Sequence, residues 1–230
     1  MIEAIIFDMD GVIVDTEYLD FQLQKDFVRS ISKEMSIEKE QKFSKLIGRS
    51  YAYLAQAIKD LSGSSLSLAE ISKQLEEYAK EWYQDINYLS LFRTDMIDIL
   101  DYAKEKGLKL AVASSSRKEH IEEVLESCGI LSYFDTVVSG EAFTESKPNP
   151  AIYLATLAKL GVAAQDAVAI EDSAYGIAAA KAAGVTVIAY EEVRMPVDQS
   201  QADYHATDMK GVLERLRLLN QQMYSELNQG

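Results

Sequence analysis

Short apolar runs rich in isoleucine, valine and alanine recur along the chain, with longer segments between them. The runs are residues 3–7, 108–113, 135–139, 167–170 and 185–190. Short runs rich in isoleucine and valine are typical of buried parallel strands. We therefore predict five parallel strands at these positions.

Segments with apolar residues at helical spacing separate the later runs. They are residues 95–107, 116–129, 149–161 and 174–184. Each ends on a glycine, which favours the left-handed conformation found just past many helices. Ser116 and Glu119 form a capping-box pattern at the start of the second segment. The alternation of strands and helices predicts a doubly wound α/β sheet.

The segment between the first two predicted strands breaks this rhythm. Residues 16–92 hold helix-like runs at 18–31 and 68–86, with a loop at 61–68 between them and no convincing strand. A parallel crossover needs only about a dozen residues or slightly more. The excess predicts a helical subdomain inserted after the first strand. The core domain would then comprise residues 1–15 and 93–230.

The amino-acid composition argues against nucleic acids and membranes as partners. The 230 residues are 48% hydrophobic, enough for a sizeable core, and the formal net charge is −14. Such a surface repels nucleic acid and anionic lipid, and no stretch approaches the roughly 20 apolar residues of a membrane span. The first apolar run is very short and has no basic flank, so no signal peptide is expected. The single cysteine fits a reducing cytoplasm. The sequence does not fix the oligomeric state, and a monomer is our expectation.

Polar residues follow several of the predicted strands. Asp8 and Asp10 follow the first, Ser114 the second, and Glu171 and Asp172 the fourth, while Lys147 precedes the helix at 149–161. Ligands of open α/β sheets bind beyond the carboxyl ends of the strands. We therefore expect these acids, the hydroxyl and the amine to converge on one rim of the sheet.

Asp8 and Asp10 are two residues apart, so in extended backbone their side chains point the same way and can reach one reacting group. Like charges this close, beside apolar residues, are costly unless a cation or a reaction uses them. A single aspartate would more often serve a turn or a helix cap. The pair, together with a second acidic pair, favours chemistry.

Glu171 and Asp172 would complete an oxygen-rich site, which suits the hard cation Mg²⁺. The alternative is that these acids cap the helix that begins near Ser173. Together with Asp8 and Asp10, the metal site is the better interpretation.

Ser114 and Ser115 lie at a strand-to-helix junction, where hydroxyls and free backbone N–H groups suit a phosphate; plain capping is the alternative. Lys147 is a point charge that can hold a transferring phosphoryl group, although an ordinary surface lysine is the usual alternative. Both types of group favour a phosphorylated ligand.

Four motifs together resemble the haloacid dehalogenase superfamily, in the branch of phosphatases and phosphohexomutases related to β-phosphoglucomutase. The motifs are "DMDGVIVDTE" at 8–17, the serine at 114, "KPNPAIY" at 147–153 and "AIEDSAYGI" at 169–177. The resemblance spans the whole chain. It implies a Rossmann-like core with an inserted all-helical cap domain at residues 16–92.

The resemblance also implies roles for the acids. Asp8 would be the nucleophile that forms an aspartyl-phosphate, and Asp10 the general acid that then becomes the base for water. Mg²⁺ would be held by Asp8, the backbone carbonyl of Asp10 and Asp172, with Glu171 as a ligand or a neighbouring acid.

Further residues would hold the substrate. Ser114, Ser115 and Lys147 would bind the phosphoryl oxygens, and Thr16 would lie at the hinge into the cap. The stretch "LIGRSYAYL" resembles a substrate-facing part of the family's cap, so Arg49 is expected to meet the substrate.

These roles predict a Mg²⁺-dependent phosphatase that acts on a small phosphorylated metabolite, a sugar phosphate being the leading candidate. Phosphosugar mutases of this branch carry a cap histidine four residues after the threonine, and here that position is Asp20. The two histidines, His120 and His205, lie outside 16–92, and we expect His205 in a C-terminal loop. A mutase is therefore the weaker alternative.

Two other activities fit less well. Dehalogenation attacks carbon and does not need the metal-binding acids. A non-enzymatic phosphoacceptor module also uses an aspartate and a lysine, but neither the long helical insert nor the Asp-x-Asp spacing favours it.

Overall fold

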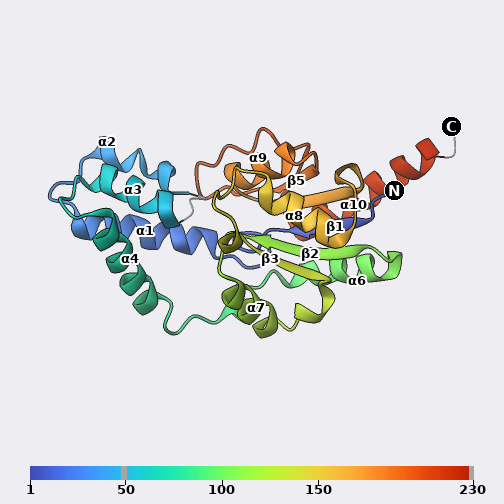
Figure 1. Ribbon diagram of the computed structural model, residues 1–230, viewed down its shortest axis with the longest axis horizontal. Helices are drawn as coiled ribbons and strands as arrows, with labels where there is room; N and C mark the ends of the chain where they lie inside the picture. Colours follow the sequence, from blue (N-terminus) through green and yellow to red (C-terminus); the bar gives the residue numbers. More distant parts are fainter. Residues whose placement is uncertain (48–50, 228–230) are drawn as a thin grey trace.

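The computed structural model describes residues 1–47 and 51–227 (Figure 1). Its strands form one parallel sheet, in the order β3-β2-β1-β4-β5-β6. They are β1 (Ala4–Phe7), β2 (Lys109–Ser114), β3 (Thr136–Ser139), β4 (Ala167–Glu171), β5 (Thr186–Tyr190) and β6 (Tyr204–Ala206). The chain runs outward from β1 to β3 and then returns to β4 on the other side. The topological switch point therefore lies at β1.

Helices lie before and between these strands. They are α1 (Glu17–Ile31), α2 (Ile37–Glu40), α3 (Tyr51–Ser62), α4 (Leu68–Trp82), α5 (Tyr88–Leu91), α6 (Ile97–Lys106), α7 (Lys118–Ser127), α8 (Ala151–Leu160), α9 (Ala174–Ala182) and α10 (Met209–Leu227). Short 3₁₀ helices cover Phe43–Leu46, Thr94–Met96, Leu131–Tyr133, Gly140–Ala142 and Ala164–Asp166. Within the described ranges, no helix is long and apolar enough to cross a membrane.

The strands send alternate side chains into two separate hydrophobic cores. In β1, Ile5 and Phe7 pack with residues of α6, α7 and α10. Ala4 and Ile6 point to the other face, where α8 and α9 pack. Alanines dominate this second face in β2 and β4, so the alanine-rich α9 can approach the sheet closely. Helices on both faces confirm the predicted doubly wound α/β class.

All five predicted strands are present, each within one or two residues of its expected bounds. The structure adds β6 and α10, which we did not predict. His205 lies in β6 and not in a loop, so that expectation was wrong. A strand of three residues with one buried side chain has no apolar run by which to predict it.

The predicted helix at 116–129 is shorter than expected. The helix α7 begins at Lys118, its N-cap position is Arg117, and no side chain caps it. The expected capping box of Ser116 and Glu119 is therefore wrong, because the Ser116 hydroxyl has another partner, described below. The capping box in this protein lies at the start of α4, between Ser67 and Glu70.

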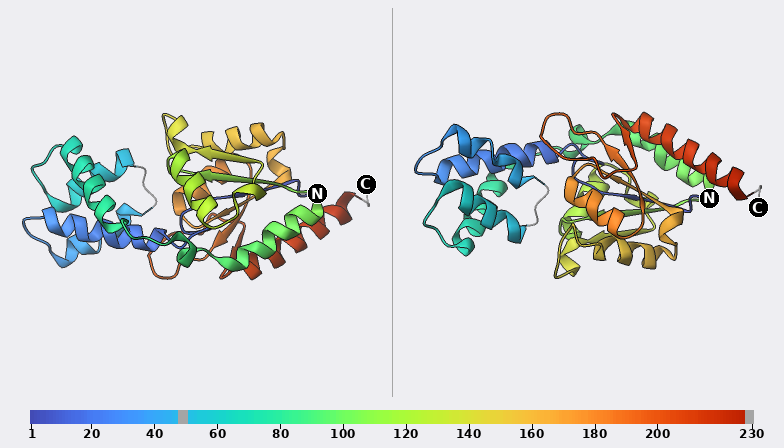
Figure 2. Two further views of the ribbon diagram at one scale, coloured as in Figure 1. Left: turned by 90° about the horizontal axis from the view of Figure 1, so that it is seen from below. Right: turned by 90° about the horizontal axis from the view of Figure 1, so that it is seen from above.

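Helices α1 to α4 lie to one side of the sheet, at the end where the strands point (Figures 1 and 2). Apolar side chains of α1, α3, α4 and residues 43–47 form a third hydrophobic cluster, separate from the two cores of the sheet, whereas Tyr88 and Leu91 of α5 pack against the first of those cores. The chain passes to these helices and back through two adjacent segments. The amide of Asp15 donates to the carbonyl of Leu91 at 2.9 Å, and the amide of Arg93 to that of Ile13 at 3.1 Å. The described part of 16–92 contains no β-strand, only an isolated bridge between Phe92 and Val14.

Candidate active site

The ammonium group of Lys147 joins the ends of three neighbouring strands. Its Nζ donates to Asp8 Oδ1 at 2.8 Å, to Glu171 Oε1 at 2.6 Å and to the Ala113 carbonyl at 3.0 Å. The Lys147 side chain is only 6% exposed. Charge-assisted hydrogen bonds of this kind are stronger than neutral ones. The predicted convergence of Asp8, Lys147 and Glu171 at one rim is therefore present.

Glu171 is completely buried and held by groups that the sequence did not single out. The Tyr153 hydroxyl donates to Glu171 Oε1 at 2.5 Å, and the Ser173 hydroxyl lies 3.5 Å from Oε2. Tyr153 is the last residue of the "KPNPAIY" motif, which was a usable signal. Ser173 also caps α9, because its Oγ accepts from the Gly176 amide at 3.0 Å. Ser173 therefore caps α9, so Glu171 and Asp172 are not needed as caps and are available to bind a ligand.

The carboxylate of Asp172 completes the acidic cluster. One oxygen each from Asp8, Glu171 and Asp172 lies within 4.8 Å of the others, close enough to share a cation. Asp172 Oδ1 is buried and finds no hydrogen-bond partner in the described part of the chain. A buried anionic oxygen without a donor is costly, so this atom is a candidate ligand for a cation. The cluster is a candidate metal site.

Two glycines allow these acids to approach the backbone. Gly11 has φ of +81°, and a Cβ there would lie 1.9 Å from Asp172 Oδ2. A Cβ on Gly176 would lie 2.0 Å from Glu171 Oε2. A side chain at either position would push the carboxylate out of its place, since real Cβ contacts are essentially never this short. The motif glycines therefore make room for the carboxylates.

The charges of the site shift its pKa values. Burial raises the pKa of Asp8 to about 7, although Lys147 pulls it down and Glu171 and Asp10 push it further up. Burial and the neighbouring charges of Glu17, Asp8 and Glu171 raise the pKa of Asp172 well above its usual range. Burial opposes the charge on Lys147, but the two acids outweigh it and raise its pKa. One ammonium thus does not neutralise the whole cluster.

The Asp10 carboxylate is held by two hydroxyl groups. Thr16 Oγ1 donates to Oδ1 at 2.6 Å, and Ser116 Oγ donates to Oδ2 at 3.0 Å. Thr16 is buried at the N-cap position of α1, but its hydroxyl makes no capping bond. We did not predict a role for Ser116 in the site, since a serine before a helix more often caps it.

The two other serines of the "SSS" run differ in burial. Ser114 is buried at the end of β2, next to the carbonyl of Ala113 that Lys147 contacts, and its Oγ accepts from the Ser116 amide at 3.1 Å. Ser115 is exposed. Ser114 is therefore one residue from the backbone carbonyl that Lys147 contacts, and its hydroxyl is engaged by the Ser116 amide. Arg49, the expected substrate contact in 16–92, lies outside the described residues.

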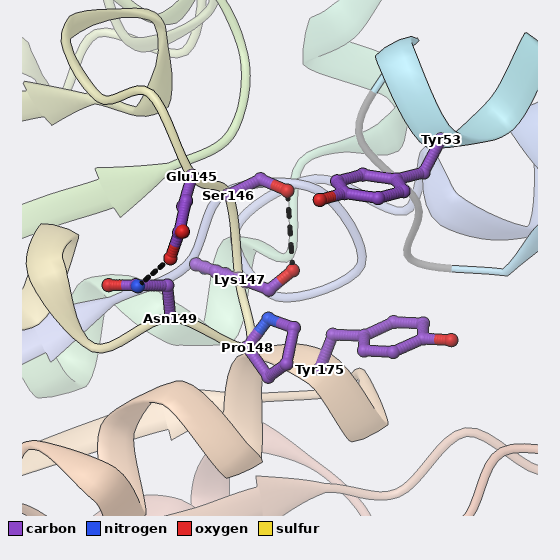
Figure 3. A pocket seen from close by; sticks show the side chains of 7 residues that line it. All are labelled: Tyr53, Glu145, Ser146, Lys147, Pro148, Asn149 and Tyr175. Atoms are coloured by element: carbon purple, nitrogen blue, oxygen red, sulfur yellow. Dashed lines mark hydrogen bonds between the residues drawn. The ribbon is translucent and has the colours of Figure 1, made fainter.

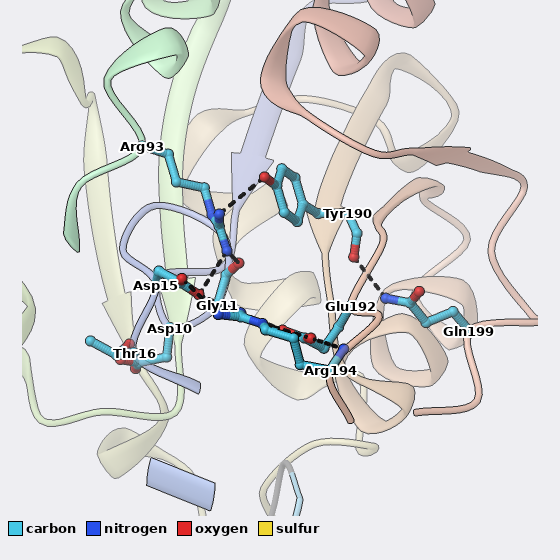
Figure 4. Close-up of polar contacts among 9 residues, drawn as sticks. All are labelled: Asp10, Gly11, Asp15, Thr16, Arg93, Tyr190, Glu192, Arg194 and Gln199. Carbon is cyan, nitrogen blue, oxygen red and sulfur yellow. Dashed lines mark hydrogen bonds and ion pairs between the residues drawn. The ribbon is translucent and has the colours of Figure 1, made fainter. Parts of the chain in front are cut away.

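A group of arginines ties the linker of Asp15 to the core (Figure 4). Arg93 donates to Asp15 Oδ1 and to the Gly11 carbonyl, both at 3.0 Å. Arg194, from the loop after β5, donates to both oxygens of Asp15 at 2.6 and 2.9 Å. Asp15 is therefore an ion-pair centre in the segment that leads into the helical insert.

The loop after β5 also reaches the metal-site acid. The side chain of Gln199 donates to the Asp172 carbonyl at 2.6 Å and to the Tyr190 carbonyl at 2.7 Å. Met195, from the same loop, is buried in the hydrophobic cluster of α1, α3 and α4. One loop thus contacts both the candidate site and the helical insert.

A pocket of about 460 Å³ opens beside Lys147 (Figure 3). Its lining residues are Tyr53, Glu145, Ser146, Lys147, Pro148, Asn149 and Tyr175. Tyr53 comes from α3 of the helical insert and Tyr175 from α9 of the core, so both parts of the molecule contribute to the pocket.

The fold and the site define an α/β protein with an acid-rich, lysine-bearing site at its topological switch point. A family model for haloacid dehalogenase-like hydrolases matches residues 5–190, and the chain belongs to this family. The chain is 33% identical over 186 residues to a protein of Thermotoga maritima named "Phosphorylated carbohydrates phosphatase". That match covers 80% of this chain and 82% of the relative.

Solved structures show the same fold. CbbY from Rhodobacter sphaeroides, in complex with xylulose-(1,5)bisphosphate, is 25% identical with a TM-score of 0.69, over 90% of this chain and 95% of that one. A β-phosphoglucomutase from Clostridium difficile has a TM-score of 0.74 at 23% identity, over 90% and 92% of the two chains. At this identity the second likeness shows the fold alone.

Proposed function

We propose that the protein is a Mg²⁺-dependent phosphatase that hydrolyses small phosphomonoesters, sugar phosphates in particular, through an aspartyl-phosphate on Asp8. The observation that carries the proposal is the contact of Lys147 with Asp8 and Glu171, next to the unpartnered oxygen of Asp172. An ammonium and carboxylates at one rim are the parts that phosphoryl transfer needs for positioning and charge neutralisation.

In the first step, a carboxylate oxygen of Asp8 attacks the phosphorus. An O–P bond forms to Asp8 while the ester O–P bond breaks, and Asp10 gives its proton to the leaving oxygen. In the second step, water attacks the phosphorus, Asp10 takes the proton of that water, and the bond to Asp8 breaks. Inorganic phosphate and the original Asp8 carboxylate result.

The other polar groups hold the phosphoryl oxygens. The Lys147 ammonium already lies 2.8 Å from Asp8 Oδ1, so it is placed to neutralise charge on a phosphoryl group bound there. Ser114 and Ser115, at the end of β2, would add hydroxyl and backbone donors. Thr16 and Ser116 orient the Asp10 carboxylate by their hydrogen bonds.

The residues present fit Mg²⁺. It would be held by Asp8, Asp172 and the backbone carbonyl of Asp10, with Glu171 as a ligand or as the acid that positions Lys147. The orphaned Asp172 Oδ1 is the kind of hard oxygen ligand that this ion prefers. Bound there, Mg²⁺ would neutralise negative charge on the phosphoryl oxygens.

The substrate class follows from the relatives and from the pocket. The Thermotoga protein is named for phosphorylated carbohydrates, and the CbbY structure contains a sugar bisphosphate. Residues 16–92 would act as a cap, with Arg49 and Tyr53 on the substrate side. A small phosphorylated metabolite is the expected partner. The single cysteine supports a cytoplasmic location, and a monomer stays our prediction.

A panel of phosphomonoesters tests the proposal. With Mg²⁺ present, purified protein should release inorganic phosphate from at least one sugar phosphate, and EDTA should abolish the release. Glucose 1-phosphate should yield free glucose and phosphate. Formation of glucose 6-phosphate instead would establish the mutase alternative, and no phosphate release from any ester would overturn the proposal.

A further inference from the structure

The first turn of α1 places Asp20 beside the proposed acid-base residue. Thr16 contacts Asp10, and the Asp20 amide donates to the Thr16 carbonyl at 2.9 Å. Residues four apart lie on the same face of a helix. The face of α1 that meets Asp10 therefore also carries the Asp20 carboxylate.

The Asp20 carboxylate is fixed in place by a second helix of the insert. The hydroxyl of Tyr83, at the end of α4, donates to Asp20 Oδ1 across 63 positions of sequence. Tyr83 keeps its proton, because burial and the charge of Asp20 raise its pKa. This bond fixes the Asp20 carboxylate between α1 and the end of α4.

Asp20 is electrostatically coupled to Asp10 and has no compensating cation among residues 1–47 and 51–227. Burial raises the pKa of Asp20 to about 7, the charge of Asp10 adds to the rise, and only the Tyr83 hydroxyl opposes it. A group bound against Asp10 would therefore lie near a second carboxylate, which makes no ion pair with a lysine or arginine of the described residues.

We propose that Asp20 restricts the substrate to monophosphates whose leaving group presents hydroxyls to the cap, and that it rejects sugar bisphosphates. This inference rests on the proposed phosphatase function and adds its substrate class. The leaving group lies at Asp10, so the far part of the substrate lies towards Asp20. A sugar hydroxyl there can donate to the carboxylate. A second phosphate carries a charge of about −1.5 to −2 and can donate little, so it is repelled.

The test compares glucose 6-phosphate with glucose 1,6-bisphosphate, which differ by one phosphate. The measured quantity is kcat/KM for the bisphosphate divided by kcat/KM for the monophosphate, with Mg²⁺ at pH 8, where Asp20 is mostly ionised. The wild-type ratio should lie well below one. Asp20→Asn removes the charge and keeps the shape, so the ratio should rise about tenfold or more, because like charges in such a site cost several kcal/mol.

Two further variants separate charge from structure. Tyr83→Phe keeps the carboxylate and should keep the ratio low. Asp26→Asn removes one charge from the same helix, at a position half-exposed and paired with Arg29, and should leave the ratio at the wild-type value. If Asp20→Asn does not fold, as judged by thermal melting, Asp20→Ser takes its place in the comparison.

The outcomes distinguish this inference from the proposed function. A wild-type ratio above one, or a ratio unchanged in a folded Asp20 variant, overturns the role of Asp20 while the phosphatase stands. If the wild-type protein hydrolyses neither sugar ester nor any other phosphomonoester with Mg²⁺, the proposed function itself fails.

Discussion

Both carboxylate oxygens of Asp10 accept hydrogen bonds from hydroxyl groups that come from different parts of the chain. Thr16 begins the helical insert, and Ser116 follows β2. A carboxylate held at both oxygens keeps one orientation, as proton transfer to a leaving group requires. The two hydroxyls therefore have a positioning role.

Replacement of Ser116 with alanine should lower kcat about tenfold and change KM little. A hydrogen bond to a charged group contributes about 1.5–3 kcal/mol, and its loss frees the Asp10 carboxylate. Steady-state kinetics on the best phosphomonoester measure the effect. Ser127→Ala is the control, because that hydroxyl donates to the Glu123 carbonyl at the exposed end of α7. A Ser116→Ala variant with wild-type kcat would contradict the positioning role.

At the residue scale, a site residue can be predicted from the sequence when its side chain is of a kind rarely found at that position. Asp8 and Asp172 could be predicted because charged residues directly after apolar strands need a reason. Lys147 could be predicted from its place before the helix at 149–161, together with those acids. Ser116 could not, because a serine before a helix more often caps it. Tyr153 lay in a recognisable motif but was not singled out, because a tyrosine within a helix has common structural roles. Their part in the site depends on which way each side chain turns, and only the folded structure shows that.

At the scale of elements, ion pairs join the Asp15 linker to the return segment and to the loop after β5. Burial alone would raise the pKa of Asp15. Hydrogen bonds from Arg194 and the positive charges of Arg93 and Arg194 outweigh this effect, so the pKa of Asp15 is lowered. The pairs are partly exposed, Asp15 being 29% and Arg194 38% accessible, which weakens them by solvent screening.

The lowered pKa of Asp15 predicts how its contribution depends on pH. A carboxylate with a depressed pKa stabilises the folded state above its unfolded value of about 3.9, and this contribution is lost as the pH falls through the folded pKa. Asp15→Asn should thus lower the free energy of unfolding by about 1 kcal/mol at pH 7, with the deficit shrinking below about pH 4.

Urea denaturation of the wild type and the variant at pH 7 and at pH 3.5 measures this difference. Asp85→Asn is the control, because Asp85 is exposed, and its replacement should change stability at neither pH. An equal deficit for Asp15→Asn at both pH values would show that the charge of Asp15 is not what holds the linker.

The elements that could be predicted are those with a strong local signal. Five apolar runs gave five strands, and glycines at 107 and 161 end their helices with φ of +67° and +65°. The edge strand β6 has no such run. Helix α10 does carry buried Val212, Leu213 and Leu216 at helical spacing, which was a missed signal. Contacts such as Met195 with the helical insert depend on long-range packing.

At the scale of the whole molecule, a net charge of −14 must coexist with an anionic substrate. The bulk surface charge is screened within about 10 Å at ordinary ionic strength. Lys147 and a bound Mg²⁺ would then set the potential at the rim of the sheet. An acidic protein can therefore bind a phosphate ester, because its surface charge is screened while the local cations lie next to the substrate.

Binding of Mg²⁺ should raise the melting temperature by several degrees at saturation, since a ligand at about 100 times its Kd adds about 2.7 kcal/mol. Differential scanning fluorimetry measures the shift, with KCl at equal ionic strength as the control. Asp172→Asn should remove most of it, because the unpartnered carboxylate oxygen becomes a neutral amide group. A full shift in Asp172→Asn would place the ion elsewhere.

The covalent role of Asp8 is tested most directly by pre-steady-state kinetics with p-nitrophenyl phosphate and Mg²⁺. In Asp10→Asn the good leaving group departs without an acid, while the attack of water lacks its base, so the aspartyl-phosphate should accumulate. We predict a burst of about one p-nitrophenolate per chain, and no burst in the double variant that also carries Asp8→Asn. An undiminished burst in that double variant would contradict the account.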